Sequence, residues 1–372
     1  MKIVLTVFLF LMASFSCKKE PQIASGSTFS LNKFEQNIKD VYPPGVVGYS
    51  YAISYLDKVE RFGAGGEARI AADGLKPYTI ETRQELFSVT KFVTAIAVCK
   101  VLGDKGKTLN EKVVDYLPSN WKIHASYNDL TFEQLLSHKS GFSLEERDFA
   151  SLKMMMTIQQ LANTYNYNNA NYALCRILLP YMYYGKENYK FDELQGLTET
   201  STATDYRTII REKVLLPSGL KYWDKADFKD WNHQGLSLFQ YTRYYLKSNL
   251  AITSGTNSDD VLIAGSRGLT LTSYEVAQIL TAFEKKELIS ELWMNEMKNK
   301  KCGFDSWVNG THGQYYWKNG GWTTNTGTGG ETIIMVFTNG VRVSLNSNSN
   351  RKLNDLFVGD PALMAKAYDD AW

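Results

Sequence analysis

Residues 85–99 read Glu85-Leu-Phe-Ser-Val-Thr-Lys-Phe-Val-Thr-Ala-Ile-Ala-Val-Cys99, with a serine and a lysine at the start of an apolar helical pattern. On a helix, Ser88 and Lys91 lie one turn apart on the same face. A serine hydroxyl is a weak nucleophile at neutral pH and needs a base beside it. Burial and nearby cations lower the pKa of a lysine, so that its neutral form can be that base. The stretch therefore predicts a nucleophile helix.

The Ser-x-x-Lys spacing alone is not specific, because it occurs six times in the chain. The copies begin at Ser16, Ser30, Ser88, Ser119, Ser218 and Ser349. Only the copy at Ser88 starts a sustained helical apolar pattern. The alternative interpretation is an ordinary first turn of a helix, so the choice depends on the other motifs of the chain.

The composition is that of a globular chain of 372 residues, with 44% hydrophobic residues and a net charge of +2. This length suits one large domain or two ordinary ones. Charges of both signs are interspersed without a long basic run, so we expect no nucleic-acid partner. The four histidines are scattered and no His/Cys spacing suggests zinc, so we expect no metal and no other cofactor. The Gly-rich run 320–330 lacks the Lys-Ser/Thr pair and the following helix of a phosphate loop.

The first 17 residues have the features of an export signal: a lysine at position 2, an apolar stretch and small residues before Cys17. They resemble the leader of a bacterial lipoprotein, although Ser14 and Phe15 stand where a leucine or valine and a small residue are usual. We expect lipidation of Cys17, with simple cleavage or a retained anchor as alternatives. Residues 18–30 form a polar tether and residues 31–372 the folded domain, anchored to the membrane in the periplasm or at the outer membrane.

Without Cys17, an odd number of cysteines remains: Cys99, Cys175 and Cys302. Cys99 and Cys175 lie in apolar helical patterns, which favours buried free thiols. One disulfide is the alternative in an oxidising periplasm.

The order of secondary-structure signals predicts strands at both ends and helices between them. Strands are expected at 46–55, with 62–66 as the turn-rich end of a hairpin, and at 331–337 and 341–345 around an Asn339-Gly340 turn. Helices are expected at 109–118, from Thr131 to Gly141, near 156–164, 171–185, 203–214, 238–247 and 272–285, and at 363–372. The pattern predicts a mixed sheet closed by the two ends of the chain, with a helical subregion at about 103–260.

Three motifs in order resemble the serine β-lactamase and penicillin-binding-protein superfamily, particularly its class C β-lactamase, D-alanyl-D-alanine carboxypeptidase and esterase branch. Ser88-Val-Thr-Lys91 is similar to the first motif, and Leu135-Leu-Ser-His-Lys-Ser-Gly141 to a stretch that commonly follows it. Tyr167-Asn-Asn169 resembles the second motif, Tyr-x-Asn. Of 23 tyrosines, only Tyr167 has an asparagine two residues later.

The third motif of the family, Lys-Thr-Gly or His-x-Gly, is similar to Lys318-Asn-Gly320, which Gly321 and Trp322 follow. Lys301-Cys-Gly303 is a rival candidate. Asn319 replaces a threonine that helps the family hold a substrate carboxylate, which weakens the expectation of β-lactam or peptide recognition. The segment 264–269 also resembles a family segment, with Arg267 in place of a glycine.

The resemblance implies an α+β (α/β) fold of the β-lactamase/transpeptidase type, with an antiparallel sheet flanked by helices. It implies that Ser88 attacks a carbonyl while Lys91 and Tyr167 share the proton, that Lys318 acts on Tyr167, and that Asn169 orients Lys91 or the substrate. The amides of Ser88 and Gly321 then form the oxyanion hole. Asn319, Gly320 and Trp322 are expected to bind the substrate.

The expected protein is a monomeric exported serine hydrolase acting on a small molecule or a peptide derived from the cell wall. The bond cleaved is an ester, an amide or a β-lactam, and the sequence leaves this choice open. The alternative is a catalytically inactive, lipid-anchored binding or sensor protein for cell-wall fragments.

Overall fold

The computed structural model of the chain describes residues 28–187, 189, 199–228, 239–245, 260–324, 327–349, 352–353 and 356–372. The predicted signal peptide, Cys17 and nearly all of the predicted tether lie outside these residues. So does part of the helix predicted at 238–247.

The core of the fold is a seven-stranded antiparallel sheet with the strand order β3-β2-β1-β10-β9-β8-β7. Its strands are β1 (Gly48–Tyr55), β2 (Lys58–Arg69), β3 (Lys76–Pro77), β7 (Ser306–Gly310), β8 (Gly313–Thr324), β9 (Gly327–Val336) and β10 (Val341–Ser347). The two ends of the chain meet where β1 pairs with β10, with Tyr51 opposite Leu345. The predicted fold class is therefore confirmed: segments from both ends of the chain build one antiparallel sheet.

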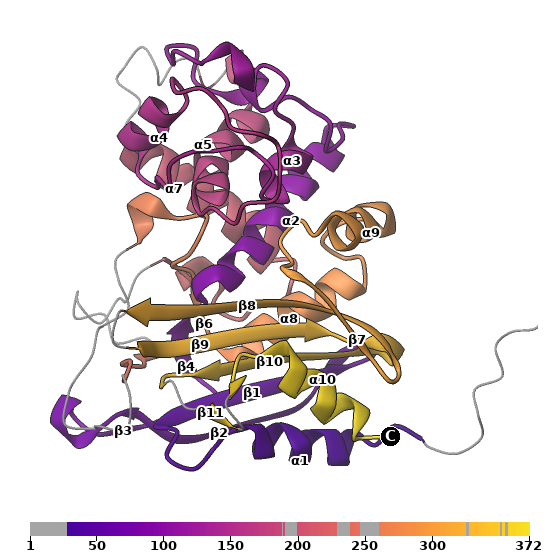
Figure 1. Cartoon of the computed structure of the whole chain (residues 1–372). Helices are drawn as coiled ribbons and strands as arrows, with labels where there is room; N and C mark the ends of the chain where they lie inside the picture. Colours follow the sequence, from indigo (N-terminus) through magenta and orange to yellow (C-terminus); the bar gives the residue numbers. More distant parts are fainter. Residues whose placement is uncertain are drawn as a thin grey trace, which may run out of the picture.

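Alternating side chains give the sheet two apolar faces. Ile333 and Met335 of β9 join a core with α1 (Leu31–Val41) and α10 (Pro361–Asp369). Ile334 and Val336 belong to the larger core that includes α2 (Thr90–Asp104) and α8 (Ser273–Glu284). In Figure 1, α1 and α10 lie along one side of the sheet, and α2 rises from its other side.

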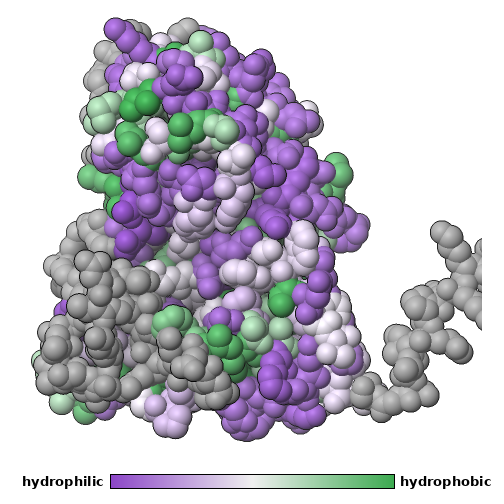
Figure 2. Space-filling view, viewed as in Figure 1, coloured by the Kyte–Doolittle hydropathy of each residue, from purple (hydrophilic) through white to green (hydrophobic). Residues whose placement is uncertain are grey.

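The helices in the described middle of the chain gather at the end of the molecule away from α1 and α10 (Figure 1). This region contains α3 (Phe132–Leu136), α4 (Phe149–Met155), α5 (Ala170–Tyr184) and α7 (Glu199–Ile210), while α9 (Glu291–Lys300) lies beside α2. On the face shown in Figure 2, this end is largely hydrophilic, with hydrophobic residues in small separate groups. Within the described ranges, no helix combines the length and apolar character needed to cross a bilayer.

Side-chain caps explain where several helices begin. Thr131 and Gln134 form a capping box at α3, and Thr272 and Glu275 form another at α8. Asp360 caps α10, whose first residue is a proline. The helices predicted at 171–185, 203–214 and 272–285 and at the C-terminus are confirmed to within a few residues, as is the hairpin around Asn339-Gly340.

The hairpin end predicted at 62–66 is wrong, because these residues lie inside β2 and the chain turns at Leu56, which has φ 51°. Gly63 and Gly65 instead make room for cross-strand aromatic rings. A Cβ on Gly63 would lie 2.6 Å from Tyr51 Oη, and one on Gly65 would lie 2.8 Å from Tyr49 Cζ. The glycines therefore mark close packing between strands rather than a turn.

Four predicted helices are shorter than expected or absent. Only a 3-10 turn, Val113–Tyr116, forms within 109–118. The helix after Thr131 stops at Leu136, because His138 adopts a left-handed φ of 59°. The helix near 156–164 is replaced by α4 just before it, and the described part of 238–247 contains the strand β5 (Gln240–Tyr241).

A small sheet leads directly into the nucleophile helix. β4 (Thr82–Glu85) lies between β5 and β6 (Thr270–Leu271) in a three-stranded sheet. Its four residues are buried, so the chain is anchored just before Ser88. Cys99, Cys175 and Cys302 are buried and free, in agreement with the predicted thiols.

Candidate active site

Ser88 lies in a 3-10 turn, Phe87–Val89, between β4 and α2. The residue before it, Phe87, is buried and has φ 47°, in the left-handed region that bulky residues rarely adopt. The Leu86 amide donates to Leu269 O at 2.8 Å, which fixes the entry to this turn. Strain of this kind is typical of functional sites, where the surrounding packing holds an unfavourable backbone in place.

Lys91 is completely buried, and its Nζ lies beside three neutral oxygens. The distances are 3.1 Å to Ser88 Oγ, 2.7 Å to Asn169 Oδ1 and 2.7 Å to Ser266 O. Burial, together with the positive charge of Lys318, lowers the pKa of Lys91 well below its ordinary value. The site therefore favours a neutral amine that can accept a proton.

Tyr167 completes the contacts of the serine, since its Oη donates to Ser88 Oγ at 2.7 Å. Tyr167 and Asn169 reach the site because they immediately precede α5, with Asn169 as its N-cap residue. The side-chain nitrogens of Lys91 and Lys318 lie 5.1 and 5.2 Å from the centre of the Tyr167 ring. The structure thus brings together four residues of the first two predicted motifs.

His138 supports Tyr167, a contact that our reading of the sequence did not assign. The two rings stack with their centroids 4.5 Å apart, and His138 Nδ1 accepts a hydrogen bond from the Asn168 amide at 3.2 Å. Burial and the charges of Lys91 and Lys318 lower the pKa of His138 to about 3, so the ring is neutral. Its place in the Leu-Leu-Ser-His stretch was the signal that could have identified it.

Lys318 is buried on β8 and forms an ion pair with Asp305, with 2.5 Å between Lys318 Nζ and Asp305 Oδ1. Nothing in the sequence singled out Asp305, which precedes β7 and contacts β8 only in the folded chain. The rival Lys301 ends α9, where its ammonium lies 4.3 Å from the ring centre of Trp307. Of the two candidates, Lys318 is the one beside Tyr167.

Gly320 allows β8 to approach the nucleophile turn. A Cβ on this residue would lie 2.5 Å from the Ser88 nitrogen and 2.8 Å from Leu86 O, so any side chain would force the strand away. Two residues of β8 bond to Asp305: Trp317 O accepts from its amide, and the Asn319 amide donates to its Oδ2. The peptide groups of every second residue of β8 therefore point toward the edge that faces Asp305. The same alternation places the Gly321 amide on that edge.

The remaining predicted substrate-binding residues differ in their surroundings. The side-chain amide of Asn319 donates to Gly359 O at 3.1 Å, away from Ser88. The backbone of Trp322 lies in β8, but its side chain is outside the described part of the structure.

A cavity of about 500 Å³ opens at the nucleophile. Its lining residues are Ser88, Tyr165, Tyr167, Asp305, Trp317, Lys318, Asn319, Gly320 and Gly321. The nucleophile, the tyrosine and the edge of β8 therefore face one space that can hold a small molecule or the end of a peptide. In the described ranges, no group of three or more His, Cys, Asp or Glu residues could hold a metal ion.

The model of the Beta-lactamase family matches residues 34–368. This chain belongs to the Beta-lactamase family. A comparison with curated proteins finds no match.

Solved structures of related fold include the octameric penicillin-binding protein homologue from Pyrococcus abyssi, with 17% identity and a TM-score of 0.66 over 92% of this chain and 77% of that one. The D-amino acid amidase from Ochrobactrum anthropi SV3 has 15% identity and a TM-score of 0.66 over 91% and 99% of the two chains. The penicillin binding protein from Bacillus halodurans has 14% identity and a TM-score of 0.60 over 91% and 99%. At these identities the likeness shows the fold alone.

Arg267, which departs from the pattern of the Beta-lactamase family, has a structural explanation. Its Nε lies 2.8 Å from Asp260 Oδ2, and its guanidinium also pairs with the buried Glu85 at 3.0 Å. Burial raises the pKa of Glu85 to about 7, although Arg267 opposes that shift. The pair fixes the loop whose Ser266 carbonyl contacts Lys91, so Arg267 acts on the site by positioning.

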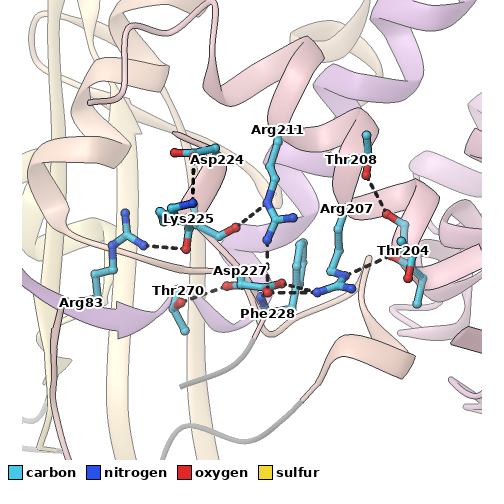
Figure 3. Close-up of polar contacts among 12 residues, drawn as sticks. Arg83, Thr204, Arg207, Thr208, Arg211, Asp224, Lys225, Asp227, Phe228 and Thr270 are labelled. Atoms are coloured by element: carbon cyan, nitrogen blue, oxygen red, sulfur yellow. Dashed lines mark hydrogen bonds and ion pairs between the residues drawn. The ribbon is translucent and has the colours of Figure 1, made fainter. Parts of the chain in front are cut away.

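A second charged cluster lies in the helical region (Figure 3). Asp227 is fully buried and accepts from Arg207 at 2.9 Å through both carboxylate oxygens. Arg211 lies 3.1 Å from the same carboxylate, and the Phe228 amide donates to it at 2.8 Å. The charge of the Asp227 carboxylate is thus matched on several sides. The backbone carbonyl of Asp227 accepts from the amide and the hydroxyl of Thr270, in the strand next to β4.

Proposed function

We propose that this protein is a serine hydrolase that forms an acyl-enzyme on Ser88 and hydrolyses an ester, an amide or a β-lactam. The observation that carries the proposal is that Ser88 Oγ lies within hydrogen-bond distance of both Lys91 Nζ and Tyr167 Oη. Membership of the Beta-lactamase family supports serine hydrolase activity in general. The amidase named above supports an amide among the candidate bonds.

The proton transfers follow from the contacts of a neutral Lys91. A neutral amine has two N–H bonds and one lone pair, and here Asn169 Oδ1 and Ser266 O are suited to accept the two N–H groups. The lone pair then faces the hydroxyl of Ser88 and takes its proton as Oγ attacks the carbonyl carbon. Tyr167, the more exposed of the two groups, passes its phenolic proton to the leaving group and regains one from the protonated Lys91. Water then releases the acyl group from Ser88.

The amides of Ser88 and Gly321 are proposed to stabilise the oxyanion. The close approach of Gly320 to the Ser88 nitrogen supports this role, because Gly321 is the next residue of the same strand. Each such donor lowers the barrier by about 3 to 4 kcal/mol. We assign Lys318 to the electrostatics of Tyr167 and Asn169 to the orientation of Lys91.

We further propose that the protein is exported and anchored through a lipid on Cys17, and that it acts as a monomer on a small molecule or a peptide derived from the cell wall. The support is the sequence of residues 1–17 and the polar stretch that follows. Replacing Cys17 with alanine should move the protein from the membrane fraction to the soluble fraction. An unchanged membrane fraction would contradict lipidation.

The test of the activity is covalent labelling. The wild-type protein is incubated with a fluorophosphonate or a fluorescent penicillin, and the labelled peptide is identified by mass spectrometry. We expect an adduct on Ser88 and none in Ser88→Ala. Ser119→Ala is the matched control, because Ser119 also begins a Ser-x-x-Lys quartet but is exposed. Absence of an adduct on Ser88 with both reagents would refute the proposal.

The second candidate is a non-catalytic binding or sensor protein that holds cell-wall fragments in the same cavity. The position of Asn319 favours it, because its side chain bonds to Gly359 O instead of offering a donor to a substrate carboxylate. Turnover of a chromogenic ester or a cephalosporin that disappears in Ser88→Ala would exclude this candidate.

A further inference from the structure

Asp305 lies where a substrate must pass, at the open edge of β8. It lines the cavity with Ser88 and Lys318, and 16% of its side chain is exposed. Oδ1 pairs with Lys318 Nζ at 2.5 Å, and Oδ2 accepts from the Asn319 amide at 3.2 Å. One carboxylate therefore binds both the lysine of the third motif and the first free amide of the strand edge.

These contacts engage the ammonium of Lys318 and N–H groups of Asn319 that would otherwise attract an anion. The side chain of Lys318 is only 3% exposed, so the exposed member of the ion pair is the carboxylate. Two of the three N–H groups of Asn319 are occupied, the backbone one by Asp305 and one of the side-chain pair by Gly359 O. In the described part of the cavity lining, an anionic group that enters along β8 therefore meets the carboxylate of Asp305 beside a lysine that is already paired.

Among the residues that the structure describes, the other charges near Ser88 do not offset this effect. Lys91 favours its neutral form, and Arg267 is paired with Glu85 and Asp260. Arg147 contributes a positive charge near Lys91, but it is not among the residues that line the cavity. Glu145, which accepts from the side-chain amide of Asn169, adds an exposed negative charge on the other side of the nucleophile.

We propose that Asp305 determines the substrate class of the site by excluding acyl donors with a carboxylate next to the scissile bond, so that the enzyme uses uncharged esters or amides. This inference rests on the proposed acyl-enzyme function. Like charges brought together in a partly desolvated site disfavour binding, whereas an uncharged group meets no such repulsion. Asp305 is thus a specificity-determining residue, and Ser88 remains the nucleophile.

The test uses two substrates that differ in charge and by one methyl group: a depsipeptide with a free C-terminal carboxylate and its methyl ester, with cleavage followed at the internal ester that both contain. The ratio of their kcat/KM values is measured for wild type, Asp305→Asn, Asp305→Glu and Asp370→Asn. Asp370 is a matched control, because it pairs with Lys366 on the exposed surface of α10. We expect wild type to prefer the methyl ester by about tenfold or more, as expected for an unfavourable interaction of about 1.4 kcal/mol. Asp305→Asn should abolish most of that preference, while Asp305→Glu and Asp370→Asn should retain it.

A second measurement needs no variant and covers the case in which Asp305→Asn does not fold. Raising the ionic strength screens the charge of the partly exposed carboxylate, so the preference of wild type for the methyl ester should shrink with added salt. Equal use of both substrates, or a preference that neither salt nor Asp305→Asn changes, would overturn the inference. If fluorophosphonate still labels Ser88 in that case, the proposed hydrolase function stands. Absence of both labelling and turnover would refute that function and this inference with it.

Discussion

Lys91 and Asp227 are both completely buried and can both carry charge, but the chain surrounds them in opposite ways. Asp227 contacts Arg207, Arg211 and a backbone amide, so its negative charge is matched by positive groups. In the described part of the chain, Lys91 contacts three neutral oxygens, and the charged side chain whose field acts most strongly on it is another lysine, Lys318. The first site surrounds a carboxylate with cations, and the second disfavours a charge on its amine.

This difference separates a stabilising cluster from a reactive one. A buried charge with matched partners holds elements together, and removing one partner leaves the others uncompensated. A buried amine without a carboxylate partner costs stability in its charged form and therefore becomes a base at ordinary pH. The comparison predicts that substitutions at Lys91 affect the rate of reaction, whereas substitutions at Asp227 affect stability.

The largest effect is expected for Lys91→Met. Loss of the base should slow the labelling of Ser88 by fluorophosphonate by about 10²- to 10⁴-fold, in line with the contribution of general bases. The melting temperature should stay the same or rise, because an apolar side chain replaces a buried amine. Lys100→Met, at a partly exposed ion pair on the same helix, is the control. Undiminished labelling, or a melting temperature several degrees lower, would contradict the prediction that Lys91 affects the rate of reaction and Asp227 the stability.

Asp227→Asn should have the opposite profile. We expect a loss of about 3 to 5 kcal/mol in the free energy of unfolding, because Arg207 and Arg211 remain without their carboxylate. Urea denaturation measures this loss, and the folded fraction should label Ser88 at the wild-type rate. Asp129→Asn, in an exposed pair with Lys112, should cost about 1 kcal/mol or less. Equal losses in the two variants would show that the buried cluster is not a stabilising one.

The smallest effect concerns Glu331, a buried acid whose carboxylate accepts from the Gly359 amide at 2.8 Å. Burial raises its pKa from 4.5 to about 7. Between these two values the unfolded chain has released this proton and the folded chain keeps it, so the contribution of Glu331 to stability is lost as pH rises through about 7. Relative to Glu331→Gln, wild type should therefore lose about 2 kcal/mol between pH 5 and pH 8 in urea denaturation.

The exposed control for this experiment is Glu81→Gln. It should follow the wild-type pH dependence of stability. If the free energies of unfolding of wild type and Glu331→Gln changed in parallel with pH, Glu331 would not keep its proton on folding. Burial without a charged partner would then not raise the pKa of Glu331.

The sequence predicted the parts of the fold that local patterns determine. The Asn339-Gly340 turn, the cap at Thr131 and the apolar run after Ser88 all depend on neighbouring residues, and each predicted its element. The glycines at 63 and 65 were misinterpreted, because the rings of Tyr51 and Tyr49 that explain them come from another strand. The end of α3 was also missed, because nothing in the local sequence announces the left-handed backbone of His138.

The candidate site also contains residues that local sequence patterns predict and residues that they do not. Ser88, Lys91, Tyr167 and Asn169 could be named in advance because they fall into recognisable spacings, and the structure brings their side chains into contact. Asp305 and Arg267 could not be assigned a role, since neither shares a recognisable motif with the residue that it pairs. Arg267 lies 182 residues after Glu85, and Asp305 reaches Lys318 only where β7 and β8 pair.

The contact between Gly320 and the amide of Ser88 also sets the order of events during synthesis. The nucleophile helix leaves the ribosome more than 200 residues before the strand that supplies the second amide of the proposed oxyanion hole. Domains form as units once their segments are available, and contacts so distant in sequence form late. A nascent or truncated chain that ends before β8 therefore carries the serine and its lysine without a complete site. The hydrolase is expected to remain inert until its last strands have joined the sheet.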